Sequence, residues 1–257
     1  MGTLMRLHTS IRVWIWRSTT NYQPPANCTR AIVLTGKGWA GRDLNNVARP
    51  GWRRHRGLWN SVRWLVLLLS WVPFALLLHG AVLNTLGPDP GRVLTLQTGH
   101  WAIRFLLLSL AVTPVRELSR LQGLAPLRRT LGLFSLLYAS LHFVCYVLFL
   151  LELRWFEIGE DILERPYITV GFGALVILIA LGATSSKAMM RRLGRNWKRL
   201  HQLVYLAAVL GVLHLSWILR TDISDAVLYA TMLVLLLGYR IAVRVGRKTR
   251  LVIRNNR

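Results

Sequence analysis

Long runs of apolar residues, separated by short polar stretches, dominate the chain from Trp64 onward. Each run approaches the about 20 residues that a helix needs to cross a bilayer, although the second does so only when counted from Gly99. The runs cover residues 64–83, 101–115, 131–151, 167–183, 200–219 and 224–243. Backbone polar groups in lipid must be satisfied within the segment that carries them. The pattern therefore predicts an all-α membrane protein, a six-transmembrane-helix bundle.

The charged residues between these runs alternate in sign. Basic residues gather before the first run, between the second and third, between the fourth and fifth, and after the sixth, whereas acidic residues gather in the intervening loops. Cytoplasmic loops carry an excess of Lys and Arg, so both termini are predicted to be cytoplasmic. A net charge of +23 suggests nucleic-acid binding only when the basic residues form one patch. Here they are spread over four segments, two loops and the two terminal tails, and no nucleic-acid partner is expected.

The remaining segments set the domain boundaries. Residues 1–57 are basic, contain Pro24 and Pro25, and show no sustained hydrophobic period, so they are predicted to be a disordered extension. Residues 58–245 form the membrane domain and residues 246–257 a basic cytoplasmic tail. The two cysteines, Cys28 and Cys145, lie far apart in unlike surroundings, which gives little support to a disulfide or a metal motif.

Two histidines lie deep in apolar runs, where an imidazole is costly unless it has a function or a partner. At 1.5 Å per residue, His142 lies about 16 Å and His214 about 20 Å from the cytoplasmic end of its helix. Both have small residues one and two turns earlier, Ala139 and Ser135 for His142 and Gly211 and Ala207 for His214. The pair is therefore predicted to ligate one haem iron from opposite sides. Close helix packing is the alternative explanation of the small residues.

His201 is predicted to lie apart from that pair. In an undistorted helix it is rotated by about 140° from His214 and lies near the cytoplasmic surface. A second haem, a quinone, a flavin, or simple hydrogen bonding at the interface all remain open for it. Arg104 is predicted either to reach lipid headgroups or to pair with a haem propionate. His79 and His100 are weaker candidates at the outer ends of their helices.

From about residue 58 to 245 the sequence resembles the MsrQ (YedZ) family, haem-binding membrane subunits of the periplasmic protein-methionine-sulfoxide reductase system within the ferric-reductase-like transmembrane group. The similar stretches include TGHWAIRF from residue 98 and WKRLHQLVYL from residue 197. Further matches lie in residues 111–115, 129–143 and 161–172 and at His214.

The resemblance implies a multi-pass protein of the bacterial inner membrane that carries haem b and FMN. It implies electron transfer from the quinone pool or a cytosolic flavin reductase to a periplasmic molybdopterin subunit that reduces methionine sulfoxide. The chain would then be a redox subunit and not a stand-alone catalyst. The family's haem histidines fall on His142, His201 and His214. The alternatives are a ferric or cupric reductase, and a non-redox transporter or scaffold.

Overall fold

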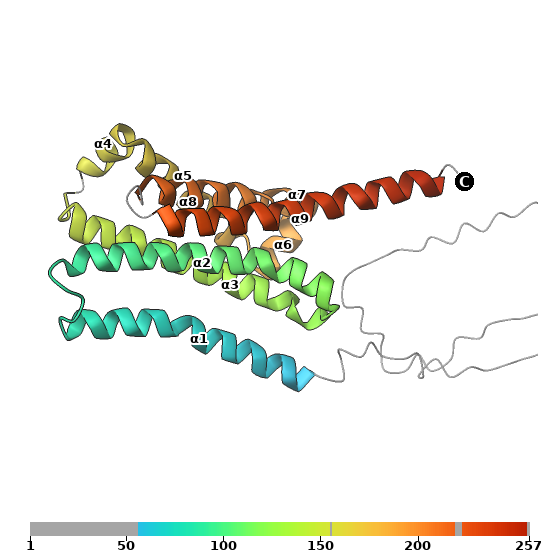
Figure 1. The fold of residues 1–257 in the computed structure, drawn as a ribbon, viewed down its shortest axis with the longest axis horizontal. Coiled ribbons are helices and arrows are strands. Elements are labelled where there is room, and N and C mark those ends of the chain that lie inside the picture. The colour runs from blue at the N-terminus through green and yellow to red at the C-terminus, as the bar shows by residue number, and fades with distance from the viewer. Residues whose placement is uncertain (1–55, 155, 219–222, 256–257) are drawn as a thin grey trace, which may run out of the picture. The chain divides into compact units, whose positions relative to one another are not determined.

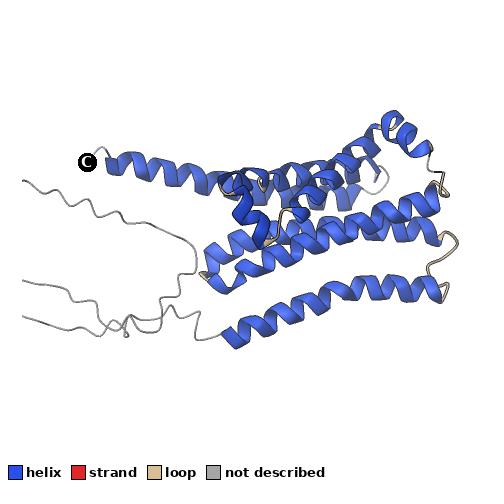
Figure 2. Cartoon of the chain, turned by 180° about the vertical axis from the view of Figure 1, so that it is seen from behind, coloured by secondary structure: helices blue, strands red, loops and turns tan. Residues whose placement is uncertain are grey.

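Helices joined by short loops and turns make up the part of the chain that the computed structural model describes, residues 56–154, 156–218 and 223–255, and none of these residues is in a strand (Figures 1 and 2). The elements are α1 (Arg56–Val82), α2 (Pro90–Ser119), η3 (Gln122–Leu124), α3 (Ala125–Cys145), the π-helix η4 (Tyr146–Leu150), α4 (Glu157–Glu164), α5 (Pro166–Ala183), α6 (Lys187–Leu193), α7 (Arg195–Leu200), α8 (Leu203–Ile218) and α9 (Ile223–Asn255). The prediction of an all-helical protein is confirmed for these residues. The predicted extension, residues 1–57, lies outside them except for its last two positions.

Five helical stretches among the described residues are long and apolar enough to cross a membrane. They are Leu58–Val82, Ala125–Leu150, Pro166–Ala183, Arg195–Ile218 and Ser224–Gly246. The chain is thus a multi-pass membrane protein. The second predicted run, residues 101–115, falls within α2, which is 30 residues long but is not one of the five. The charged residues of α2, Arg92, Arg104, Arg116 and Glu117, make its mean hydropathy lower than that of the five spans.

Helix α2 is the central helix of the fold. One cluster of buried residues joins it to α5, α8 and α9, with Leu110 of α2 only 1% exposed and Ala207 of α8 fully buried. A second cluster joins Ala102 and Phe105 of α2 to Phe134 and Tyr138 of α3. Because α2 contacts protein on several sides, fewer of its side chains have to be compatible with lipid.

Successive long helices run in alternating directions, so the loops collect at two ends of the described part (Figure 1). The α1–α2 turn and α4 lie at one end, called here the acidic end, with Asp89, Glu152, Glu157, Glu160, Asp161 and Glu164. The opposite, basic end holds η3, α6 and α7 with Arg120, Arg128, Arg129, Lys187, Arg191, Arg192, Arg195, Lys198 and Arg199. The segregation of charge seen along the sequence is therefore also a segregation in space.

Several elements differ from the predicted runs. Two short helices, α4 and α6, were not predicted, because neither has an apolar run of membrane length. Helix α9 continues to Asn255, beyond the predicted domain boundary at residue 245. A turn at His201 and Gln202 separates α7 from α8, where a single uninterrupted helix was assumed.

Tyr138 of α3 holds α1 at the point where Pro73 interrupts it. Proline lacks the N–H of a regular helix and its ring crowds the preceding turn. The Tyr138 hydroxyl donates to the Ser70 carbonyl at 2.9 Å and accepts from the Phe74 N–H at 3.0 Å. In a regular helix these two backbone groups pair with each other. Since Tyr138 is fully buried, its hydroxyl is well placed to satisfy both.

We expect Tyr138→Phe to destabilise the protein by about 1–3 kcal/mol, because two backbone groups lose a partner away from water. The apparent midpoint of thermal unfolding in detergent should fall by roughly 5 °C. Adding Pro73→Ala should recover much of this loss, since α1 can then close its own hydrogen bonds. An unchanged midpoint for Tyr138→Phe would contradict the proposed bridge.

Candidate haem-binding site

A cavity of about 650 Å³ lies between α2, α3, η4, α5 and α8 and reaches α4 at the acidic end. That volume is within the range of about 300–1,000 Å³ typical of cofactor sites. Its walls are mainly apolar, with Ile103 and Leu106 of α2, Leu175 and Leu178 of α5, and Ala207 of α8. The cavity can therefore hold a sizeable and largely apolar group among the helices.

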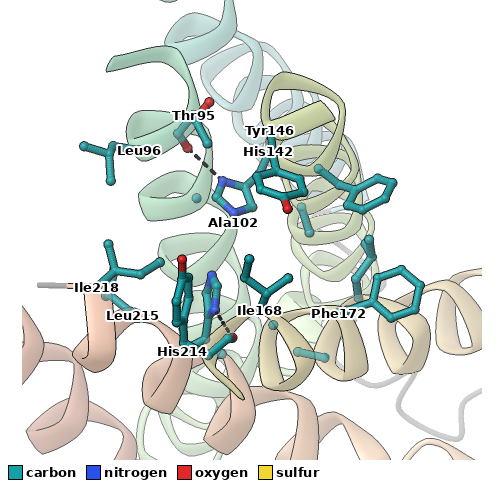
Figure 3. A pocket seen from close by; sticks show the side chains of 18 of the residues that line it. Thr95, Leu96, Ala102, His142, Tyr146, Ile168, Phe172, His214, Leu215 and Ile218 are labelled. Atoms are coloured by element: carbon teal, nitrogen blue, oxygen red, sulfur yellow. Dashed lines mark hydrogen bonds between the residues drawn. The ribbon is translucent and has the colours of Figure 1, made fainter. Parts of the chain in front are cut away.

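His142 of α3 and His214 of α8 face each other across this cavity (Figure 3). Their ring centroids are 6.0 Å apart and their planes are inclined by 79°. A metal–imidazole bond is about 2 Å long, so two imidazoles on opposite sides of one ion have centroids roughly 6 Å apart. The observed separation suits a shared ion.

Both rings are held by backbone carbonyls. The Nδ1 atom of His142 lies 2.8 Å from the Thr95 carbonyl oxygen, and that of His214 lies 2.6 Å from the Tyr167 carbonyl oxygen. A carbonyl only accepts hydrogen bonds, so each Nδ1 carries the proton and donates it. Each Nε2 is left with its lone pair available. A hydrogen bond at the far nitrogen is the usual way in which a protein orients a metal-ligating histidine.

A glycine lies one helical turn after each of these carbonyls. A Cβ atom on Gly99, four residues after Thr95, would lie 3.0 Å from Nδ1 of His142. A Cβ atom on Gly171, four residues after Tyr167, would lie 2.6 Å from Nδ1 of His214, closer than real contacts allow. The two sites thus share one construction, in which a carbonyl holds the ring and a glycine makes room for it.

These observations fit a haem better than a bare metal ion. The described residues contain no group of three or more His, Cys, Asp or Glu side chains that could hold a metal by themselves. A porphyrin supplies four nitrogens of its own and needs only axial ligands from the protein. Two opposed imidazoles in an apolar cavity provide that arrangement.

The acidic end of the cavity is lined by polar groups that sequence reasoning did not identify. Tyr146, the first residue of the π-helix η4, donates its hydroxyl hydrogen bond to Asp161 of α4. Asp161 also pairs with Arg165 at 3.0 Å. The hydroxyl of Tyr167 and the carboxylate of Asp161 raise the pKa of Arg165, so its guanidinium stays charged. π-Helical turns are frequent at functional sites, but nothing in the apolar run 131–151 signals one.

The structure brings together two of the four residues predicted for the site. His201 lies at the turn between α7 and α8, outside the cavity lining, where its ring stacks on Trp197 with centroids 4.1 Å apart. Arg104 is also outside the lining: its Nε donates to the Tyr229 hydroxyl at 2.8 Å and its guanidinium lies 4.8 Å from the Trp101 ring centroid.

Comparison with known proteins agrees with this architecture. The family described as "Ferric reductase like transmembrane component" matches residues 98–212. A protein of Xanthomonas euvesicatoria pv. vesicatoria is 44% identical over 176 residues, which cover 68% of this chain and 80% of the relative. A protein of Xanthomonas campestris pv. campestris is 43% identical over 183 residues, 71% of this chain and 83% of the relative.

Both of these relatives carry the name "Protein-methionine-sulfoxide reductase heme-binding subunit MsrQ". A third relative with the same name, from Xanthomonas oryzae pv. oryzae, is 44% identical over 175 residues, 68% of this chain and 79% of the relative. The matches extend over most of each relative, and the family match spans α3, η4, α4 and α5 together with parts of α2 and α8. The chain therefore belongs to the MsrQ family of ferric-reductase-like transmembrane proteins.

Proposed function

We propose that this chain is the haem b-binding, electron-transferring membrane subunit of a protein-methionine-sulfoxide reductase system. The observation that carries the proposal is the opposed pair of His142 and His214, in which each Nδ1–H donates a hydrogen bond to a backbone carbonyl and each Nε2 keeps its lone pair. Relatives named as haem-binding subunits of that system support it. A bound haem supplies one-electron oxidation and reduction.

The protein's own groups have three tasks in this proposal. The carbonyls of Thr95 and Tyr167 keep the imidazoles in the ligating tautomer and orientation. The apolar walls exclude water from the iron. The close packing of the helices would hold both histidines in the same place whether a bound haem is oxidised or reduced.

We further propose that α2 is the sixth membrane helix, that the basic end is cytoplasmic, that both termini are cytoplasmic, and that the membrane is the bacterial inner membrane. The clustering of Lys and Arg at one end of the helices supports that orientation. The acidic end, where the cavity reaches α4, then faces the periplasm. It is the side on which a periplasmic molybdopterin reductase would accept electrons.

Electrons enter at the opposite, basic end in this proposal. His201 lies there and is a further haem ligand or a contact to another cofactor. The stacked rings of Trp197 and His201, and Arg240 at 4.9 Å from the Tyr205 ring centroid, offer aromatic and cationic groups there. Such groups suit the flat ring and phosphate of FMN. The donor in this proposal is the quinone pool or a cytosolic flavin reductase.

A dithionite-reduced minus oxidised spectrum of membranes that overexpress the chain tests the proposal. We expect the sharp bands of a six-coordinate b-type haem, and at least one haem per chain when the purified protein is assayed as the pyridine haemochrome. Membranes that contain the chain but show no haem bands would refute it and favour a non-redox transporter or scaffold. A loaded protein that reduces Fe³⁺ or Cu²⁺ without a periplasmic partner would favour a metal reductase.

A further inference from the structure

The charged residues that line the cavity are all at its acidic end. Three arginines, Arg92, Arg154 and Arg165, and two acids, Glu157 and Asp161, line it there. The opposite part of the lining is apolar apart from Ser135, whose hydroxyl donates to the Ala102 carbonyl at 2.9 Å. An occupant with an apolar body and an ionised edge can therefore take only one orientation, with that edge among the arginines.

Two of these three arginines already have partners within the chain. Arg154 pairs with Glu157 at 2.9 Å, and Arg165 pairs with Asp161 at 3.0 Å. Arg92 differs: within the part of the chain that the structure describes, its guanidinium makes no ion pair or hydrogen bond. Three positive charges against two negative ones leave one positive charge, and it resides on Arg92.

The position of Arg92 on α2 directs it at the cavity. Residues 92, 95 and 99 are spaced by three and four positions, so they lie along one face of the helix. The same face carries the Thr95 carbonyl that holds His142 and the Gly99 that makes room for it. Gly99 is two turns, or about 10 Å, farther along the axis than Arg92. A long arginine side chain can thus meet the edge of a group that is centred between the histidines.

The first turn of α2 is itself held in place. The Asp89 side chain accepts a hydrogen bond from the Arg92 backbone N–H at 3.0 Å and caps the helix. Gly91 is buried, and a Cβ there would lie 2.6 Å from the Cβ of Phe149 in η4. This close approach fixes the start of α2 against the π-helix, so the backbone that carries Arg92 is not free to move away.

We propose that Arg92 binds the propionate carboxylates of the haem and so sets its orientation, with the propionate edge at the acidic end. The assignment rests on the proposed haem site and adds a residue to it. Arg104 is on a different face of α2, twelve positions or about 120° away, and is engaged with Tyr229 and Trp101. The role that the sequence suggested for Arg104 is therefore given to Arg92.

A chemical probe separates charge pairing from a structural role. Full-length apoprotein in detergent is loaded with haem b or with haem b dimethyl ester, which lacks the two carboxylate charges, and haem loss to excess apomyoglobin is timed. For haem b, Arg92→Gln should accelerate loss about fivefold, as expected for one partly exposed charge-assisted pair. For the dimethyl ester, wild type and Arg92→Gln should lose the cofactor at the same rate.

Two further variants and the behaviour of the wild type separate a failure of the role of Arg92 from a failure of the haem site. Arg92→Lys keeps the charge and should retain most of the wild-type rate, and Arg104→Gln should leave the rate unchanged. Equal rates of haem b loss for wild type and Arg92→Gln would overturn the role of Arg92 alone, as would an effect of equal size with the dimethyl ester. Failure of the wild type to bind either compound would overturn the haem site itself.

Discussion

Substituting Ala for His142 or His214 is expected to remove haem from the purified chain. Among the residues that the structure describes, His142 and His214 are the histidines that line the cavity, and no cysteine or methionine lines it. Loss of a partner that merely orients a ligand already costs about 10- to 100-fold in metal affinity, so loss of the ligand itself should cost more. The haem content per chain and the reduced α-band should both fall by more than about tenfold.

Two controls distinguish ligand loss from misfolding. His79→Ala removes an exposed histidine of α1 that does not line the cavity, and should leave the haem content unchanged. Free imidazole added to His142→Gly should enter the space left by the ring and restore the six-coordinate spectrum. Full haem retention in both single alanine variants would show that the iron is held elsewhere.

Five of the six predicted membrane helices are also long and apolar enough in the structure to cross a membrane. A segment in lipid must form its backbone hydrogen bonds internally, as a helix does, and its lipid-facing side chains must be apolar. Helix α2 shows where that signal weakens. Its residues face other helices, and such contacts tolerate the polar Thr95, Thr98 and Ser109, all buried. Hydropathy therefore identifies helices that contact lipid, and it identifies less well a central helix that contacts mainly other helices.

The two deep histidines were predictable because an imidazole in an apolar run needs a reason to be there. The groups that orient them were not. His142 bonds a carbonyl 47 residues away in α2, and His214 bonds one 47 residues away in α5, and every residue type has such a carbonyl. The available signal was Gly99 and Gly171, since glycine inside a helix is unfavourable unless something must come close.

His201 shows that the angle between two residues on a helix can be calculated from their spacing only where the helix is continuous. Its rotation relative to His214 was calculated for an undistorted helix, whereas a turn at His201 and Gln202 separates α7 from α8. The 140° figure therefore does not apply to the actual backbone. His201 lies outside the cavity lining, and its role as a further haem ligand or cofactor contact stays a prediction.

Gly171→Ala is expected to disable the site while removing no functional side chain. The added Cβ would lie 2.6 Å from Nδ1 and 2.7 Å from Cε1 of His214. The ring cannot move aside without breaking its hydrogen bond to the Tyr167 carbonyl at 2.6 Å. We therefore expect haem content to fall by about tenfold, the cost of losing the group that orients a ligand. Any haem that remains should show a five-coordinate, high-spin spectrum.

Gly173→Ala on the same helix is the matched control. A Cβ at Gly173 meets only Leu210, at 3.9 Å, which is an ordinary contact. Replacing a glycine inside a helix by alanine is otherwise stabilising by about 0.5–1 kcal/mol, so this variant should keep its haem and unfold at the same or a higher temperature. If Gly171→Ala behaved in the same way, His214 would not be the ring that needs the space. Loss of haem in Gly171→Ala but not in Gly173→Ala would identify His214 as a ligand. This evidence would come from a substitution in α5 and would be independent of any histidine substitution.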